Sequence, residues 1–182
     1  MSYPCPCAYS MKWSKYGHVL QFPDYFYRKE LRDQYAEFIH NLCRWDWFCT
    51  MTWKSLVHPE SASKLFHCFV HRLNRRIYGH SYYKKQDLGV FCCIAVEKQL
   101  RQVLHIHALI CGVPSNIIYT DLALCWQRKA GSCDIQPYDC NRDAGHYLSK
   151  YVAKDAEIEF YGNTRQVENY EVPEFISRWP LL

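Results

Sequence analysis

The chain has 182 residues, which suits one domain, and 49% of them are hydrophobic, which is enough for a sizeable core. Its formal net charge of +4 is mildly basic and does not by itself indicate a nucleic-acid partner. No apolar run approaches the length of a membrane span, and residues 1–10 are polar and Pro-rich, unlike a secretory signal. We therefore expect a single intracellular domain over residues 1–182 that does not associate with membranes.

The 11 cysteines are scattered through apolar segments, as in Cys92-Cys93, and this pattern is typical of reduced core residues. Cys5 and Cys7 form a CxC pair, and no CxxC pair occurs in the sequence. A structural zinc site therefore stays open as an alternative, with weak support.

In the first half of the chain, apolar residues spaced three or four apart predict a helix over residues 28–42, and a strand follows over residues 46–53. After a break at His58-Pro59-Glu60, a second apolar helix face runs from Leu65 to Ile77 and ends near Gly79.

The other side of that second helix is expected to be polar and exposed. A basic stretch follows it, from Arg72 to Lys85, and its simplest interpretation is a solvated surface. Arg75 and Arg76 are weak candidates for phosphate contacts. The predicted polar side carries Lys64, His67, His71, Asn74 and Arg75.

The second half of the chain predicts an antiparallel sheet with helices. Its expected elements are strands over 89–97 and 103–112 that form a hairpin, a helix over 116–130, a short strand near 132–138, and a helix over about 143–156 that Asn141 can cap. Residues 157–182 give no clear pattern. The order of elements indicates an α+β domain with helices packed mainly on one face of the sheet.

A pair of histidines on the second hairpin strand is the first candidate for chemistry. Side chains alternate between the faces of a strand, so His105 and His107 point the same way while Leu104 and Ile106 point into a core. Two such imidazoles can share one metal ion. Taken alone, an HxH pair is more often two ordinary histidines.

The neighbouring strand adds a carboxylate. If the hairpin turns near Leu100, odd-numbered residues face odd-numbered residues, and Glu97 lies diagonally near His105. Two histidines and one carboxylate leave positions open on a divalent ion, where phosphate oxygens can bind. The plainer interpretation of Glu97 is a polar residue at a strand end.

The last predicted helix carries a stripe of tyrosine and lysine. Tyr147, Lys150, Tyr151 and Lys154 are spaced three and four apart, so they share one arc of the helix surface. Such a stripe is usually a plain amphipathic face. Here it also fits two phenols and two ammonium groups directed at a phosphate.

Together these segments resemble the three motifs of the His-hydrophobic-His (HUH) endonucleases, in the right order. The segment Phe48 to Trp53 is similar to the first motif, with Met51 where leucine is usual. His105-Ile106-His107 resembles the metal motif, and residues 147–154 resemble the tyrosine motif in its two-tyrosine form, YxxKYxxK. The resemblance covers about residues 46–155 and favours rolling-circle replication initiators (Rep proteins).

The resemblance implies a ferredoxin-like or RRM-like antiparallel sheet of about five strands, with Mg²⁺ or Mn²⁺ held by Glu97, His105 and His107. It implies cleavage of single-stranded or hairpin origin DNA by a tyrosine, which leaves a 5′-phosphotyrosine and a free 3′-OH. Thr50, Thr52 and Trp53 are then candidates for a DNA-facing strand. The replicon would be a plasmid or virus, in the cytoplasm of a prokaryotic host.

The resemblance also assigns roles to the tyrosine stripe. Relatives with one tyrosine often keep the second position, so Tyr151 is expected to make the first cut and Tyr147 to support a second transfer. Lys150 or Lys154 would add positive charge at the phosphoryl oxygens. Because the sequence has no GxxxxGK[ST] loop, the helicase and the polymerase are expected to be separate proteins.

Three other interpretations remain open. A tyrosine transposase of the same class would act on hairpins at element ends. A non-catalytic RRM-like domain would bind nucleic acid without cutting it. A zinc-structured interaction domain would use the cysteines. A conjugative relaxase fits less well, because its tyrosine precedes the histidine motif.

Overall fold

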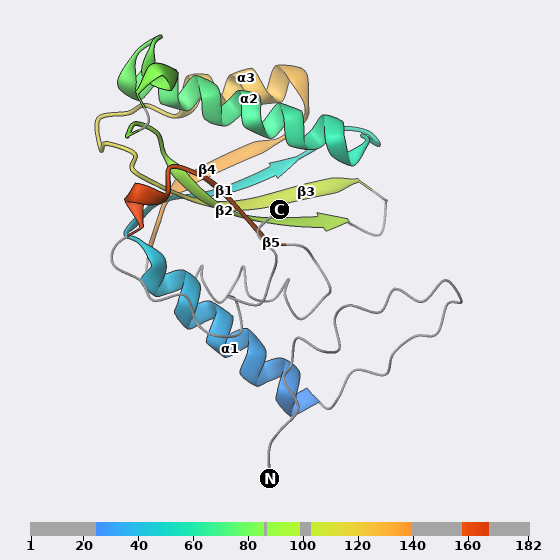
Figure 1. The fold of residues 1–182 in the computed structure, drawn as a ribbon. Coiled ribbons are helices and arrows are strands. Elements are labelled where there is room, and N and C mark those ends of the chain that lie inside the picture. Colours follow the sequence, from blue (N-terminus) through green and yellow to red (C-terminus); the bar gives the residue numbers. More distant parts are fainter. Residues whose placement is uncertain (1–24, 86, 99–102, 140–157, 168–182) are drawn as a thin grey trace.

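A five-stranded antiparallel sheet organises the chain in the computed structural model, which describes residues 25–85, 87–98, 103–139 and 158–167 (Figure 1). The strand order is β4-β1-β3-β2-β5, so β3 is the central strand. The strands are β1 (Trp45–Thr52), β2 (Phe91–Lys98), β3 (Leu104–Cys111), β4 (Cys133–Pro137) and β5 (Ile158–Gly162).

Three α-helices pack on this sheet: α1 (Tyr25–Leu42), α2 (Pro59–Tyr78) and α3 (Thr120–Lys129). Two short 3-10 helices, η2 (Tyr82–Lys84) and η4 (Thr164–Gln166), follow α2 and β5. Figure 1 shows α2 and α3 together over one face of the sheet and α1 on the opposite side. Of the helices in the described ranges, none has the length and apolar character needed to cross a bilayer.

The prediction of an α+β fold with a ferredoxin-like sheet is confirmed. The elements β1-α2-β2-β3-α3-β4 follow the βαββαβ order, and their strands lie in the spatial order β4-β1-β3-β2. The expectation that helices cover mainly one face holds for α2 and α3. Helix α1 differs, because it covers part of the other face.

The main core lies between the sheet and the pair α2 and α3. Strand β1 alternates buried and half-buried residues, and its buried side chains, such as Met51, enter this core. Trp53 and Trp126 meet edge to face with ring centroids 5.0 Å apart, and Phe69 packs on Trp126. Each such side chain contributes roughly 1.5–3 kcal/mol through burial.

A second apolar cluster joins α1 to the other face of the sheet. Phe38, Ile39 and Leu42, spaced three and four apart on α1, pack with residues of β2 and β3 that include Leu109. The Trp45 indole N–H donates to the Ile39 carbonyl at 2.7 Å, which ties the end of α1 to the start of β1. This cluster contains Leu109 and Cys111 of β3 but neither histidine of that strand.

Two details of the predicted helices are wrong. Helix α3 begins at Thr120 and not near residue 116, because the chain first makes a turn in which the Ile117 amide donates to the Pro114 carbonyl at 3.0 Å. Asn74 is only 6% exposed and not on a polar face. Its Oδ1 accepts the Val90 amide at 2.9 Å, so a buried backbone donor is satisfied where β2 is approached.

Gly131 lies where the backbones of β1 and the segment before β4 touch. A Cβ at this position would lie 2.1 Å from the Thr52 carbonyl oxygen. Backbone hydrogen bonds on both sides, from Thr52 to Ser132 and from Lys54 to Ala130, hold the two segments together. This close approach therefore requires glycine.

We expect Gly131→Ala to lower the free energy of unfolding by about 2 kcal/mol or more, since overpacking costs about 1–3 kcal/mol even where side chains can yield. Chemical denaturation measures this loss. Ser132→Ala, at the exposed neighbouring residue, is the control and should change stability by less than about 0.5 kcal/mol. Equal stability of Gly131→Ala and the wild type would contradict the close approach.

Candidate functional site

The two histidines of β3 share one face of the central strand, as the alternation predicts. Leu104 and Ile106 belong to the core beneath α2 and α3, whereas His105 and His107 project from the opposite face. His107 is buried at 4% exposure and His105 is half-buried. Their ring centroids lie 6.0 Å apart, with 35° between the ring planes.

Glu97 of β2 lies beside these histidines. Across the β2–β3 ladder Glu97 is the direct partner of His105, and Ala95 is the partner of His107. The expected pairing of odd with odd positions is therefore correct, but Glu97 lies opposite His105 and not diagonal to it. The carboxylate leans toward the other histidine, and Glu97 Oε2 is 3.9 Å from His107 Nε2.

The donor set of Glu97, His105 and His107 suits a divalent ion, although the side chains are not drawn together around one point. Two atoms that each bind one ion at about 2.1 Å lie on the order of 3–4 Å apart, and the 3.9 Å between Glu97 and His107 is at the upper end of that range. Within the described ranges, no group of three or more His, Cys, Asp or Glu residues is close enough to hold a metal ion as it stands. Tightening this site requires side-chain rotation, and the strand register already supplies the backbone positions.

Strand β1 completes two rows of side chains across this face. Thr50 is the direct partner of His107, and Thr52 is the direct partner of His105. The Thr50 hydroxyl lies 3.3 Å from Nδ1 of His107, and the Thr52 hydroxyl lies 3.4 Å from Nδ1 of His105. We call this set of two histidines, two threonines and Glu97 the histidine face.

Phe48 also borders the histidine face, and the sequence analysis assigned no role to it. Its ring stacks on the imidazole of His107, with centroids 6.3 Å apart and 13° between the planes. Phe48 and Thr50 lie two residues apart, so a period of two along β1 could have placed Phe48 with the threonines. Ala95, whose small side chain lies beside His107, could have been found by the same counting along β2.

The cysteines of the sheet are protonated core residues. Burial raises the pKa of the thiols of Cys49, Cys92 and Cys93, and burial also raises the pKa of Cys133 to about 12. A thiol must lose its proton to act as a nucleophile or to bind zinc well. These four thiols are therefore poor nucleophiles and poor zinc ligands at neutral pH. Cys5 and Cys7, on which the zinc alternative also rests, lie outside the described residues.

Three of the predicted DNA-contacting residues lie away from the histidine face. The prediction for Trp53 is wrong, because its side chain is 6% exposed and belongs to the core on the other side of the sheet. Arg75 and Arg76 lie on α2, in the layer that covers that same side. Arg76 forms an ion pair with Asp121 of α3 at 3.0 Å, and the Arg75 guanidinium contacts His80.

Tyr147, Lys150, Tyr151 and Lys154, together with the helix predicted over 143–156, lie outside the described residues. Their roles stay predictions.

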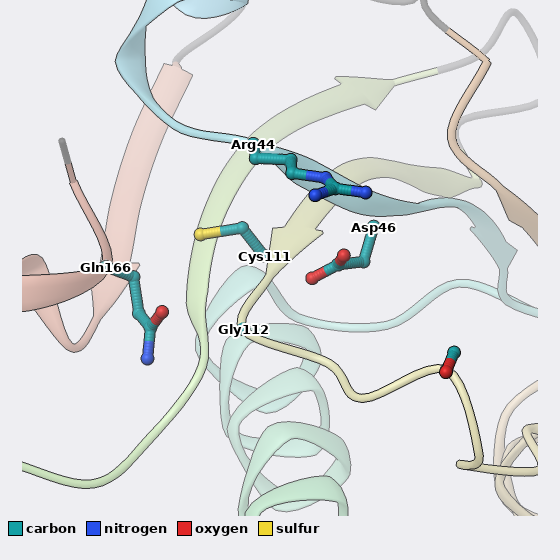
Figure 2. Close-up of a pocket in the computed structure, with 6 residues that line it drawn as sticks. Arg44, Asp46, Cys111, Gly112 and Gln166 are labelled. Carbon is teal, nitrogen blue, oxygen red and sulfur yellow. The ribbon is translucent and has the colours of Figure 1, made fainter.

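A pocket of about 390 Å³ lies at the other end of β3 (Figure 2). Cys111, Gly112 and Gln166 line it, with Arg44 and Asp46 from the start of β1. The Asp46 carboxylate accepts the Val113 amide at 2.8 Å, so it has a structural role. Cys111 is four residues beyond His107, about 13 Å at 3.3 Å per residue, so the pocket is separate from the histidine face. We base the candidate site on the histidine face, because its side chains have the matching chemistry.

Comparison with known proteins identifies a family. Residues 46–156, more than half of the chain, match the family of replication-associated proteins of the ORF2 type. No curated protein and no solved structure matches. The matched range begins one residue after the start of β1 and includes all three residues of the candidate metal site.

Proposed function

Because this chain belongs to the ORF2-type family of replication-associated proteins, we propose that it is a replication initiator that nicks and rejoins single-stranded origin DNA through a tyrosine. One observation carries the chemical part of the proposal. Two imidazoles on the central strand and a carboxylate on its neighbour share one face, with 3.9 Å between His107 Nε2 and Glu97 Oε2.

Glu97, His105 and His107 would hold Mg²⁺ or Mn²⁺. When bound, the ion would act as a Lewis acid that polarises the scissile phosphate and stabilises charge on its oxygens. Such help is needed because a free tyrosine has a pKa near about 10 and is a weak nucleophile at neutral pH. The half-buried setting of these residues limits the water around them, which strengthens electrostatic interactions.

The proposed reaction exchanges one phosphodiester for another. The phenolic oxygen of Tyr151 attacks the phosphorus, the bond from phosphorus to the 3′ oxygen breaks, and that oxygen takes up a proton as a free 3′-OH. The phenol proton passes to solvent or to a base that we do not assign. The 5′ phosphate is then esterified to the tyrosine, and a later attack by a 3′-OH on this ester rejoins DNA without ATP.

The direct test incubates the full chain with a library of single-stranded DNA that has a randomised centre. With Mn²⁺ we expect a covalent protein–DNA adduct that survives denaturing electrophoresis, and sequencing of the freed 3′ ends should reveal one preferred cleavage site. EDTA should abolish the adduct. DNA binding without any adduct would overturn the proposal and would support a non-catalytic RRM-like domain.

A further inference from the structure

The threonines of β1 make a repeated contact with the two histidines. In each row of the histidine face, the hydroxyl of one threonine lies within hydrogen-bonding distance of one imidazole, at 3.3 Å for His107 and 3.4 Å for His105. Both contacts use Nδ1 of the ring. The strand register explains the repetition, since Thr50 and Thr52 are the direct cross-strand partners of the two histidines.

The choice of ring nitrogen has a chemical consequence. A neutral imidazole has one nitrogen that carries a proton and one that offers a lone pair. If Nδ1–H donates to a threonine oxygen, Nε2 is the nitrogen with the lone pair, and only a lone pair can bind a metal ion. Nε2 of His107 is also the atom that lies 3.9 Å from the Glu97 carboxylate.

The threonine hydroxyls are themselves held in place. β1 pairs with β3 on one side and with β4 on the other, and the Thr52 amide donates to the Ser132 carbonyl at 2.9 Å. Cys49 and Met51, which alternate with the threonines, are fully buried in the core on the opposite face. A β-branched side chain on such a strand has restricted rotation about its first torsion, so the direction of the hydroxyl is defined.

We propose that Thr50 and Thr52 are positioning residues that hold His107 and His105 with the proton on Nδ1 and Nε2 turned toward the metal. This inference rests on the proposed metal-dependent function. It gives the threonines a role toward the protein's own histidines, whereas the sequence alone suggested contacts with DNA. A threonine hydroxyl that accepts from an imidazole can still donate its own proton.

The test compares Thr50→Val and Thr52→Val with Thr50→Ser and Thr52→Ser, all without DNA. Valine keeps the shape and removes the hydroxyl, and serine keeps the hydroxyl. Calorimetric titration with Mn²⁺ should show binding about 10-fold to 100-fold weaker in each valine variant, the usual effect of losing an outer partner of a metal ligand. The serine variants should stay within about threefold of the wild type. Thr164→Val, at an exposed threonine of η4, is the matched control and should not change Mn²⁺ affinity.

A second measurement reads the rings without metal. In ¹⁵N-histidine NMR spectra of the metal-free protein at a pH where the rings are neutral, His105 and His107 should be Nδ1–H tautomers in the wild type. Each valine variant should shift its own partner histidine toward the Nε2–H tautomer that free imidazole side chains favour, and the serine variants should not.

The outcomes separate the two proposals. If the wild type binds no Mn²⁺ but shows the Nδ1–H tautomers and loses them in the valine variants, the metal site fails and the positioning role stands. If the wild type binds Mn²⁺ and the valine variants bind it equally well, the positioning role is overturned and the proposed function stands. Nε2–H tautomers in the metal-free wild type would also overturn it. Weaker DNA binding with unchanged Mn²⁺ affinity would assign the threonines to DNA.

Discussion

Replacing His107 with alanine should reduce Mn²⁺-dependent nicking by about 10³-fold or more. A metal ion that stabilises charge on a phosphate contributes several kcal/mol to the transition state, and each 1.36 kcal/mol is about tenfold in rate. His105→Ala should have a similar effect, because each removes one of three proposed ligands. Initial rates of adduct formation on the cleavage-site oligonucleotide measure both losses.

The control for this prediction is His71→Ala. His71 is exposed on α2, on the other side of the sheet, where its Nδ1 lies 2.8 Å from the Tyr82 hydroxyl. Its loss should leave nicking within about twofold of the wild type, since it lies far from the proposed chemistry. His107 is buried and stacks on Phe48, so circular dichroism must show that His107→Ala is folded. Full activity of a folded histidine variant would remove the metal site from the mechanism.

The second large effect concerns the nucleophile. We expect Tyr151→Phe to abolish the first covalent adduct, because phenylalanine has no oxygen with which to form the phosphate ester. Tyr147→Phe should leave the first adduct intact and slow the second transfer. A labelled oligonucleotide that is followed through cleavage and then rejoining separates the two steps.

Tyr161→Phe provides a matched control on a described strand. Tyr161 lies on β5, stacks on His67 of α2 and should not affect the adduct. Loss of the first adduct only in Tyr147→Phe would reverse the order of the two tyrosines. An adduct that persists in the double variant Tyr147→Phe, Tyr151→Phe would assign the nucleophile elsewhere.

The histidine face could be predicted well from the sequence because strands obey a period of two. Once β3 was recognised, the alternation put His105 and His107 on one face, and the expected turn put Glu97 on the same face. The side-chain directions were beyond this counting. Glu97 is opposite His105 yet leans toward His107, and only the three-dimensional packing decides such a choice.

Other features depend on contacts that a single sequence does not display. Asn74 is placed like a surface residue by helix periodicity, but a backbone amide 16 residues away needs its oxygen. Trp53 continues β1 beyond the threonines, and odd numbering along the strand puts it with Met51 in the core. The edge strand β5 was missed because its side chains are half-buried or exposed and so carry only a weak apolar pattern.

The central place of β3 determines how the ligand residues respond when the protein opens locally. Strands β4 and β5 are the edges of the sheet, and edges release their amide protons to solvent through small, low-energy openings. The amides of His105 and His107 lie between two paired neighbours and should exchange among the slowest in the domain. Because a slip of one residue would turn both imidazoles into the core, pairing on both sides of β3 also keeps the ligands in register while an edge frays.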